Sequence, residues 1–218
     1  MTIQAVYFDL GGVIVRTEFQ APRQHLAERF EMEYDDLVKM VFDSETSAQA
    51  SLGLIREQEH WVAVARRLHL PESEIQSVRE EFFAGDVTDL RLLDFMRALR
   101  KQVKVGLISN AWSGMRTWIV SKKFEDVFDS MTISAEVGVA KPDACIFRKA
   151  LETLDVAPAE SVFLDDFADN VDGARAVGMH AILFKQVDRA LEELNQILAG
   201  HRQPSTRVGR LGDEFKHE

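Results

Sequence analysis

Asp9 is the residue of this sequence whose type and position most clearly suggest chemistry. It follows the apolar run 3–8 and precedes a turn that contains Gly11 and Gly12. At the end of a strand, beside a glycine turn, a carboxylate is exposed and can attack a phosphoryl group or an alkyl carbon. Because strand-end aspartates also occur at ordinary turns, Asp9 alone does not establish a function.

A second acidic site follows the apolar run 162–164. Asp165 and Asp166 are adjacent there, and Asp169 and Asn170 come soon after them. Two neighbouring carboxylates repel each other unless a cation lies beside them. We expect Mg²⁺, because this ion binds one or two carboxylates together with phosphate and water oxygens. A helix-capping turn would account for one of the two aspartates but not for both.

Two further sites have the groups that bind a phosphate. Ser109 and Asn110 follow the apolar run 103–108, and Lys141 precedes Pro142-Asp143 at the expected first turn of a helix. Hydroxyl and backbone N–H groups near a helix start bind phosphate oxygens, and a lysine held by a rigid turn can neutralise a carboxylate and a phosphate. The alternatives are a helix N-cap by Ser or Asn, near Ser113, and an ordinary surface lysine.

The elements between these sites predict how the sites come together. Five short apolar runs are typical of strands, and segments with a helical spacing of apolar residues lie between the later ones. This alternation predicts an α/β fold, a Rossmann-like parallel sheet with helices on both faces. All four sites then lie at carboxyl ends of strands and converge on one crevice. The expected strands are 3–8, 103–108, 130–133, 162–164 and 180–184.

Residues 19–88 interrupt the alternation of strands and helices. Their apolar spacing predicts four amphipathic helices and no strand, a small helical bundle inserted after the first strand as a cap over the site. The expected division is a Rossmann-like core at 1–18 and 89–200, a helical cap at 19–88 and a mobile tail at 201–218. The candidates for the cleft between cap and core are His60, Trp61 and Trp112, with packing as the expected role of the two tryptophans.

Composition restricts the partners of the protein. The 218 residues carry 26 basic and 36 acidic side chains, a formal net charge of −10. This charge argues against nucleic acid and against an anionic membrane as partners. No run is apolar enough to cross a bilayer and no signal peptide is recognisable, so we expect a cytoplasmic monomer or homodimer. Cys145, the single cysteine, cannot form an intramolecular disulfide, and we expect it to be buried.

The four sites together resemble the motifs of the haloacid dehalogenase superfamily. The resemblance covers roughly residues 1–200 and is closest to the branch with the phosphatase domain of soluble epoxide hydrolase and the bacterial sugar-1-phosphate phosphatases. Residues 19–88 resemble the helical cap of that family. The matching segments are Phe8-Asp9-Leu10-Gly11-Gly12-Val13, Leu107-Ile108-Ser109-Asn110, Val139-Ala140-Lys141-Pro142-Asp143 and Phe163-Leu164-Asp165-Asp166 with Asn170.

The resemblance implies a Mg²⁺-dependent phosphatase that hydrolyses a small phosphorylated metabolite. Asp9 would be the nucleophile that becomes an aspartyl-phosphate. Asp9 and Asp166 would bind Mg²⁺ through their carboxylates, and Gly11 would bind it through its backbone carbonyl. Asp165 would be a further ligand or would support the others. Three residues would hold the transferring phosphoryl group: Ser109, Asn110 and Lys141.

One position departs from the family pattern. Most phosphatases of the family carry an aspartate two residues after the nucleophile, which acts as general acid and then as general base, but this chain has Gly11 there. General acid–base catalysis is typically worth about 10²–10⁴-fold in rate. The substrate then has a good leaving group, another acid replaces the aspartate, or turnover is poor. The substitute acids considered are Glu18, Asp43, Glu45 and His60.

Two other hypotheses follow from the same residues. A 2-haloacid dehalogenase displaces a halide with the same carboxylate and needs neither a metal nor an acid at Gly11. Asp165 and Asp166 argue against it, because carboxylates without a cation repel an anionic 2-haloacid. A weakly active or non-catalytic binding module of the same fold would also be consistent with Gly11.

Overall fold

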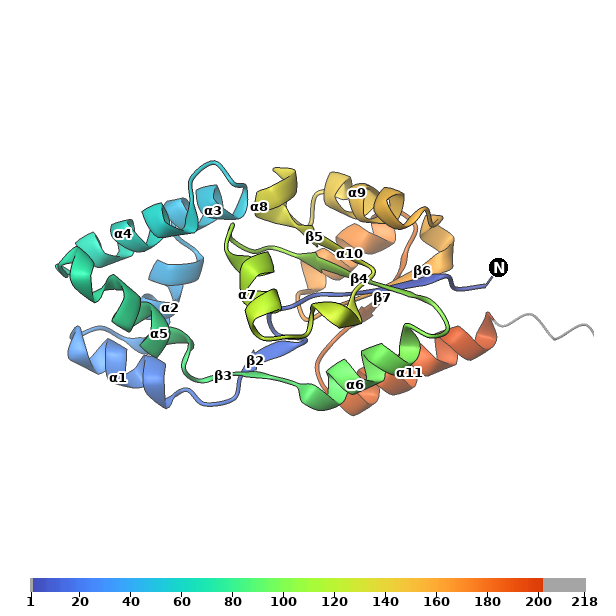
Figure 1. Ribbon diagram of the computed structural model, residues 1–218, viewed down its shortest axis with the longest axis horizontal. Coiled ribbons are helices and arrows are strands. Elements are labelled where there is room, and N and C mark those ends of the chain that lie inside the picture. The colour runs from blue at the N-terminus through green and yellow to red at the C-terminus, as the bar shows by residue number, and fades with distance from the viewer. Residues whose placement is uncertain (1, 202–218) are drawn as a thin grey trace, which may run out of the picture.

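The computed structural model describes residues 2–201, and its centre is a five-stranded parallel sheet (Figure 1). The strand order is β5-β4-β1-β6-β7, which confirms the expected Rossmann-like α/β fold. Each strand lies within two residues of its expected range, and residues 202–218 of the expected tail lie outside the described part. The strands are β1 (Ala5–Phe8), β4 (Lys104–Ser109), β5 (Ser130–Ile133), β6 (Ser161–Asp165) and β7 (His180–Leu183).

Helices cover both faces of this sheet, as expected. The central strand β1 is buried on both sides, since Val6 and Phe8 belong to one apolar cluster and Ala5 and Tyr7 to another. The first cluster includes side chains of α6 (Leu90–Leu99), α7 (Met115–Ser121) and α11 (Val187–Gly200). The second includes side chains of α9 (Ala144–Leu154) and α10 (Ala168–Ala176). The short helices are α8 (Ser134–Val137) and the 3₁₀ turns η2 (Glu125–Val127) and η3 (Pro158–Glu160).

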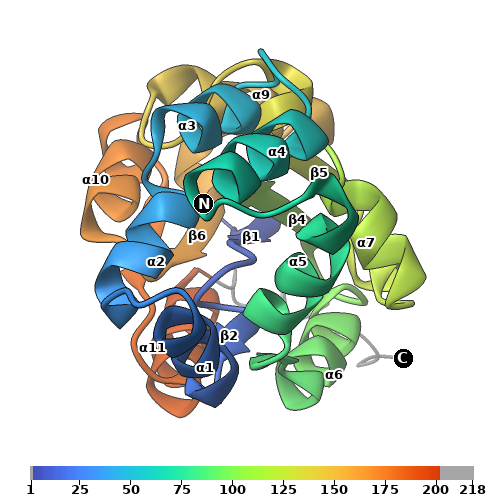
Figure 2. The same ribbon diagram turned by 90° about the vertical axis from the view of Figure 1, so that its left-hand side faces the viewer.

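A separate group of helices lies beyond one end of the sheet (Figures 1 and 2). It has an apolar cluster of its own, which includes Leu26, Leu37, Trp61, Val78 and Phe82. These helices follow the end of β1 in sequence and face the edge where the parallel strands end, as the cap hypothesis expects. They are α1 (Ala21–Arg29), α2 (Tyr34–Phe42), α3 (Glu45–Ser51), α4 (Glu57–Arg67), the 3₁₀ turn η1 (Glu72–Glu74) and α5 (Ile75–Phe83).

The expectation of four helices and no strand in 19–88 was wrong in two respects. The additional helix is α3, whose small polar sequence has no apolar stripe and which begins at Ser44, where the hydroxyl accepts a hydrogen bond from the Ser47 N–H. The additional strand is β3 (Asp86–Thr88), which pairs antiparallel with β2 (Val15–Thr17). Neither three-residue strand has an alternating apolar pattern that the sequence could reveal. The two strands pair because the chain leaves the core at β2 and returns to it at β3.

Polar side chains hold this two-stranded ribbon between the helical group and the core. Arg16 on β2 binds the Asp89 carboxylate at 2.8 Å, and the Thr17 hydroxyl donates to Asp86 at 2.7 Å. The buried Arg23 of α1 binds the same Asp86 carboxylate at 2.8 Å. Asp89 also accepts the Leu92 N–H and so begins α6. The ribbon thereby connects the helical group to α6, which packs on one face of the sheet.

Cys145 is exposed, so its expected burial was wrong. It lies on the outer side of α9, whose buried side chains include Ile146, Phe147 and Ala150. The expectation rested on the residue type, whereas the packing of α9 against the sheet places Cys145 on the exposed side of the helix.

None of the helices formed by residues 2–201 is long and apolar enough to cross a membrane.

We predict that Asp89→Ala destabilises the protein by about 1–2 kcal/mol, because it removes the N-cap of α6 and the partner of Arg16. The control is Asp188→Ala, which removes the exposed ion pair with Arg91 and should cost less than about 0.5 kcal/mol. Urea unfolding followed by circular dichroism measures both. Equal losses in the two variants would contradict this account of the ribbon.

Candidate active site

Three neighbouring strands bring predicted site residues to one edge of the sheet. β1 lies between β4 and β6, so Asp9, Ser109 and Asp165 all lie at the carboxyl ends of adjacent strands. The backbone N–H of Asp9 donates to the Leu164 carbonyl at 2.9 Å, which continues the pairing of β1 with β6. The convergence expected from the sequence is therefore present.

Lys141 lies between two of these carboxylates. Its Nζ is 2.8 Å from Asp9 Oδ1 and 2.6 Å from Asp165 Oδ2, and it donates to the Ile108 carbonyl at 3.0 Å. Its side chain is only 1% exposed, so the alternative of an ordinary surface lysine was wrong. A buried ammonium is stable only when its charge and its protons are matched, and these three oxygens provide that match.

The backbone of Lys141 is fixed from two sides. The Asn110 side-chain amide donates to the Lys141 carbonyl at 2.9 Å and accepts its N–H at 2.8 Å. Gly173 on α10 lies so close to Pro142 that a Cβ there would be 2.6 Å from the Pro142 carbonyl oxygen. The Lys141–Pro142 peptide is cis, and α9 begins after the N-cap Asp143, so Pro142 is outside the helix rather than in its first turn.

Asn110 and Ser109 therefore have different parts in the site. The Asn110 amide is occupied by the Lys141 backbone, so its side chain positions the lysine. The Ser109 hydroxyl is buried and forms none of the hydrogen bonds that the described residues make with one another. The helix after β4 begins at Met115, with Gly114 as its N-cap, so neither Ser109 nor Asn110 caps it. Ser109 remains available to an oxygen of a bound group.

The adjacent aspartates are also unlike each other. Asp165 is completely buried, and its two oxygens accept hydrogen bonds from Lys141, the Phe167 N–H and the Asn170 amide. Asp166 is partly buried, and within residues 2–201 its side chain forms no hydrogen bond or ion pair with another residue, only a hydrogen bond with its own backbone N–H. Burial raises the pKa of Asp166, and the charge of Asp165 raises it further. Asp165 is thus satisfied within the protein, whereas the Asp166 carboxylate is opposed only by its own backbone N–H and by the charge of Lys141, with which it makes no ion pair.

These carboxylates fit a divalent cation. One oxygen each from Asp9, Asp165 and Asp166 lies within 4.8 Å of the others. Burial also raises the pKa of Asp9, although Lys141 opposes that shift. A cation with oxygen ligands would remove the electrostatic cost that these raised pKa values express. Asp9 and Asp166 have the free oxygens for it, and the hydrogen bonds of Asp165 suit a supporting role.

Gly12 has a role that the sequence motif did not reveal. Its φ of 77° lies in the left-handed region, and a Cβ there would be 2.1 Å from Asp166 Oδ2. The Asp166 carboxylate therefore lies directly against the Gly12 backbone. Gly11 differs, because a Cβ at this residue would have no atom within 4 Å and its φ is outside the left-handed region. Gly11 leaves open space one residue away.

The candidate substitute acids do not bind Asp9 in this structure. Glu18 pairs with Arg16 at 3.2 Å, and Asp43 and Glu45 are exposed on the helical group. His60 is completely buried, with its Nδ1 bound to the Thr46 hydroxyl at 2.9 Å. Burial lowers the pKa of His60, so its neutral form is favoured. Within residues 2–201, none of the four forms a hydrogen bond or an ion pair with Asp9.

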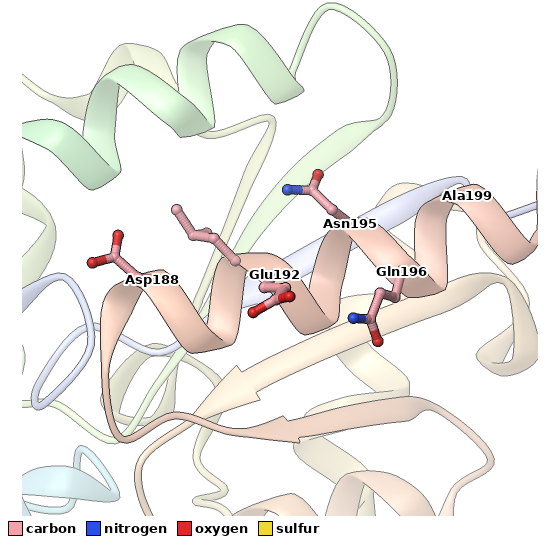
Figure 3. A pocket seen from close by; sticks show the side chains of 6 residues that line it. Asp188, Glu192, Asn195, Gln196 and Ala199 are labelled. Carbon is pink, nitrogen blue, oxygen red and sulfur yellow. The ribbon is translucent and has the colours of Figure 1, made fainter.

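A surface hollow elsewhere on the molecule has no part in this arrangement. It lies along α11, and Figure 3 shows the side chains that line it projecting from that helix. It contains none of the predicted site residues and is bordered by the exposed ion pair of Asp188 with Arg91. Its lining residues are Asp188, Leu191, Glu192, Asn195, Gln196 and Ala199.

Comparison with known proteins agrees with the motifs. The model of the haloacid dehalogenase-like hydrolases matches residues 3–178. The chain belongs to this family. It is therefore a haloacid dehalogenase-like hydrolase, and the resemblance seen in the four motifs is confirmed.

Several relatives in this family are phosphatases by name. A sesquiterpene phosphatase of Aspergillus oryzae is 28% identical over 199 residues, covering 90% of this chain and 97% of that protein. A phosphatase of Mycobacterium tuberculosis is 27% identical over 215 residues, covering 92% and 99%. Bifunctional epoxide hydrolase 2 of the rat is 29% identical over 217 residues, covering 90% of this chain but 39% of the hydrolase. The chain thus spans about two fifths of the length of the epoxide hydrolases it matches.

Solved structures share the fold. A predicted hydrolase of the family from Porphyromonas gingivalis superposes with a TM-score of 0.74 at 20% identity, covering 91% of this chain and 98% of that one. A 2-haloacid dehalogenase from Pseudomonas syringae superposes with a TM-score of 0.61 at 20% identity, covering 91% and 99%. Since a 2-haloacid dehalogenase shares the fold of a chain whose relatives include named phosphatases, the fold does not distinguish a phosphatase from a dehalogenase.

We predict that Gly12→Ala weakens Mg²⁺ binding by about 10–100-fold, because the new Cβ displaces the Asp166 carboxylate. Gly11→Ala is the matched control, since its Cβ meets no atom and should leave the affinity within about twofold. Isothermal titration calorimetry with MgCl₂ measures both affinities. Similar affinities in the two variants would show that Asp166 does not depend on Gly12.

Proposed function

We propose that this protein is a Mg²⁺-dependent phosphatase that hydrolyses a small phosphorylated metabolite through an aspartyl-phosphate on Asp9. The observation that carries the proposal is the buried Lys141, which forms ion pairs with Asp9 and Asp165 but none with Asp166. The names of the Aspergillus and Mycobacterium relatives support phosphate ester hydrolysis. A structure of the fold from Bacteroides thetaiotaomicron, solved with magnesium and inorganic phosphate, supports the metal.

In this proposal the acidic residues share the work of holding the ion. Asp9 and Asp166 bind Mg²⁺ through carboxylate oxygens, and Gly11 binds it through its backbone carbonyl. Asp165 supports the site by holding Lys141. The bound ion would offset the negative charge that a phosphate monoester brings to three carboxylates.

The protein groups then carry out a displacement at phosphorus. Lys141 holds one Asp9 oxygen, so the other is directed towards the phosphoryl group. A bond forms between this oxygen and phosphorus while the ester P–O bond breaks, and the departing oxygen takes a proton from water. Ser109 and the Asn110 segment hold the phosphoryl oxygens, and Lys141 joins them by exchanging its hydrogen bond to the Ile108 carbonyl for one to a phosphoryl oxygen. Water then attacks the phosphorus, the P–O bond to Asp9 breaks, and inorganic phosphate is released.

We further propose that residues 19–88 form a cap and that 1–18 with 89–200 form the catalytic core. The separate apolar cluster of α1–α5 and the ribbon of β2 with β3 support this division. The cap would enclose the phosphate ester and exclude bulk water from the developing charge.

The dehalogenase alternative uses the same Asp9 but has less support from the site. An anionic 2-haloacid would meet the Asp166 carboxylate, which makes no ion pair with Lys141 and repels the haloacid when no cation is bound. The alternative predicts halide release that does not need a divalent ion, so the two hypotheses differ in their dependence on Mg²⁺.

We predict that the protein hydrolyses p-nitrophenyl phosphate with Mg²⁺, that EDTA abolishes this turnover, and that Asp9→Asn lowers it by at least about 10³-fold. The aryl leaving group needs little protonation, so the absence of an acid at residue 11 should not conceal activity. The visible absorbance of the released p-nitrophenolate measures the rate. No turnover, combined with chloride release from a 2-haloacid in EDTA, would establish the dehalogenase instead.

We predict that Gly11→Asp raises turnover of alkyl phosphates by up to about 10²-fold and that of aryl phosphates much less, because an added acid helps most when the leaving oxygen is basic. The structure accommodates the new side chain, since Gly11 has open space and an ordinary φ. The ratio of kcat/KM for the two ester classes is the measurement. An equal or negative effect on both classes would mean that another group already supplies the proton.

A further inference from the structure

Phenylalanines are exposed around the edge that carries the site. Phe19, Phe42 and Phe167 are 64%, 41% and 67% exposed, and they are the only exposed phenylalanines among residues 2–201. Phe167 directly follows Asp166, Phe19 lies two residues after β2, and Phe42 ends α2 of the helical group. Burying such a ring is worth about 1.5–3 kcal/mol. Phe167 follows the site-bearing strand β6, and Phe42 stacks on Trp112, which follows β4, so both exposed rings favour an apolar ligand near the site.

Phe42 is connected to the phosphate end of the site through Trp112. The two rings are stacked with centroids 6.1 Å apart and an angle of 26° between their planes. Trp112 comes from the core, two residues after Asn110, which holds the backbone of Lys141. The Trp112 ring is only 9% exposed and belongs to the apolar cluster of the helical group. Residues 110–112 therefore contact both the Lys141 backbone and the Phe42 ring.

A charged group that borders this surface is already neutralised. The Arg23 guanidinium lies 5.6 Å from the centre of the Phe42 ring and 4.4 Å from that of Phe82. It is buried and paired with Asp86 at 2.8 Å, and its Nε donates to the Phe82 carbonyl. It therefore contacts the rings of Phe42 and Phe82 without offering a free charge to a polar ligand.

Gly11 leaves room next to the nucleophile. A side chain at this residue would project into space that no other atom occupies within 4 Å of its Cβ. An organic group attached to the phosphate can use that space.

We propose that Phe42 and Trp112 form a subsite for the organic part of the substrate, and that the substrate is a phosphate monoester of a large apolar alcohol. The inference rests on the proposed phosphatase function and specifies its substrate class. In this subsite Phe42 contacts the apolar chain of the substrate, and Trp112 fixes the position of the Phe42 ring. Phe167 directly follows Asp166, one of the proposed metal ligands. The Phe42 ring offers no hydrogen-bonding group to the hydroxyls of a sugar phosphate, and the unpartnered His60 Nε2 and Trp61 Nε1, which pack against Trp112, are buried.

The experiment measures the affinity of alkylphosphonates, which have no ester bond to hydrolyse, by calorimetry on the full chain with Mg²⁺. We expect affinity to rise at least about tenfold from methyl- to hexylphosphonate, since each buried methylene strengthens binding. We expect butylphosphonate to bind more tightly than 3,4-dihydroxybutylphosphonate, which has the same carbon chain. Affinity independent of chain length, or preference for the dihydroxy compound, would overturn the inference.

Phe42→Ala assigns the effect to the proposed surface. We expect it to reduce the gain from methyl to hexyl by about fivefold, the range of one aromatic contact, and Phe42→Leu to restore part of it. The control is Leu54→Ala, which removes a side chain of the helical group that is 71% exposed. An unchanged chain-length dependence in Phe42→Ala overturns the assignment. Hydrolysis of p-nitrophenyl phosphate by the wild type tests the phosphatase function separately.

Discussion

The buried ion pairs of Lys141 are the interaction on which the rest of the site depends. An ammonium group that is almost fully removed from water needs opposite charges in contact, and Asp9 and Asp165 supply them from two adjacent strands. Asn110 fixes the lysine backbone, and the close approach of Gly173 to Pro142 restricts the turn that carries it. The parallel sheet matters for function because its strand order places these groups at one edge.

The same network separates the three carboxylates by role. Asp165 is used to hold Lys141, so its charge is compensated within the protein. Asp166 lies against Gly12 with no such partner and provides the place for a cation. In the proposed mechanism these residues supply the groups for phosphoryl transfer, whereas Gly11 stands where most phosphatases of the family carry an acid. The open space at Gly11 and the aromatic surface beside Trp112 are consistent with a site adapted to the size and polarity of its leaving group.

The sequence predicted the sheet and the meeting of its functional residues, because buried parallel strands appear as apolar runs whose ends carry the site. It did not predict β3, α3 or the exposure of Cys145, since these depend on tertiary pairing and on which helix side meets the sheet. The motif named Asn110 and Gly12 but not their contacts. Asn110 contacts Lys141, which is 31 positions later, and Gly12 contacts Asp166, which is 154 positions later. No local pattern encodes contacts over such separations.

The central claim is that Asp9 accepts the phosphoryl group. Its most direct test is to mix the protein rapidly with Mg²⁺ and p-nitrophenyl phosphate and to stop the reaction with acid. Mass spectrometry then examines the peptide that contains Asp9. The account predicts a peptide heavier by one phosphoryl group, with the modification on Asp9, that forms before phosphate is released in bulk. Turnover without phosphorylated Asp9, or with the phosphoryl group on another residue, would contradict the account.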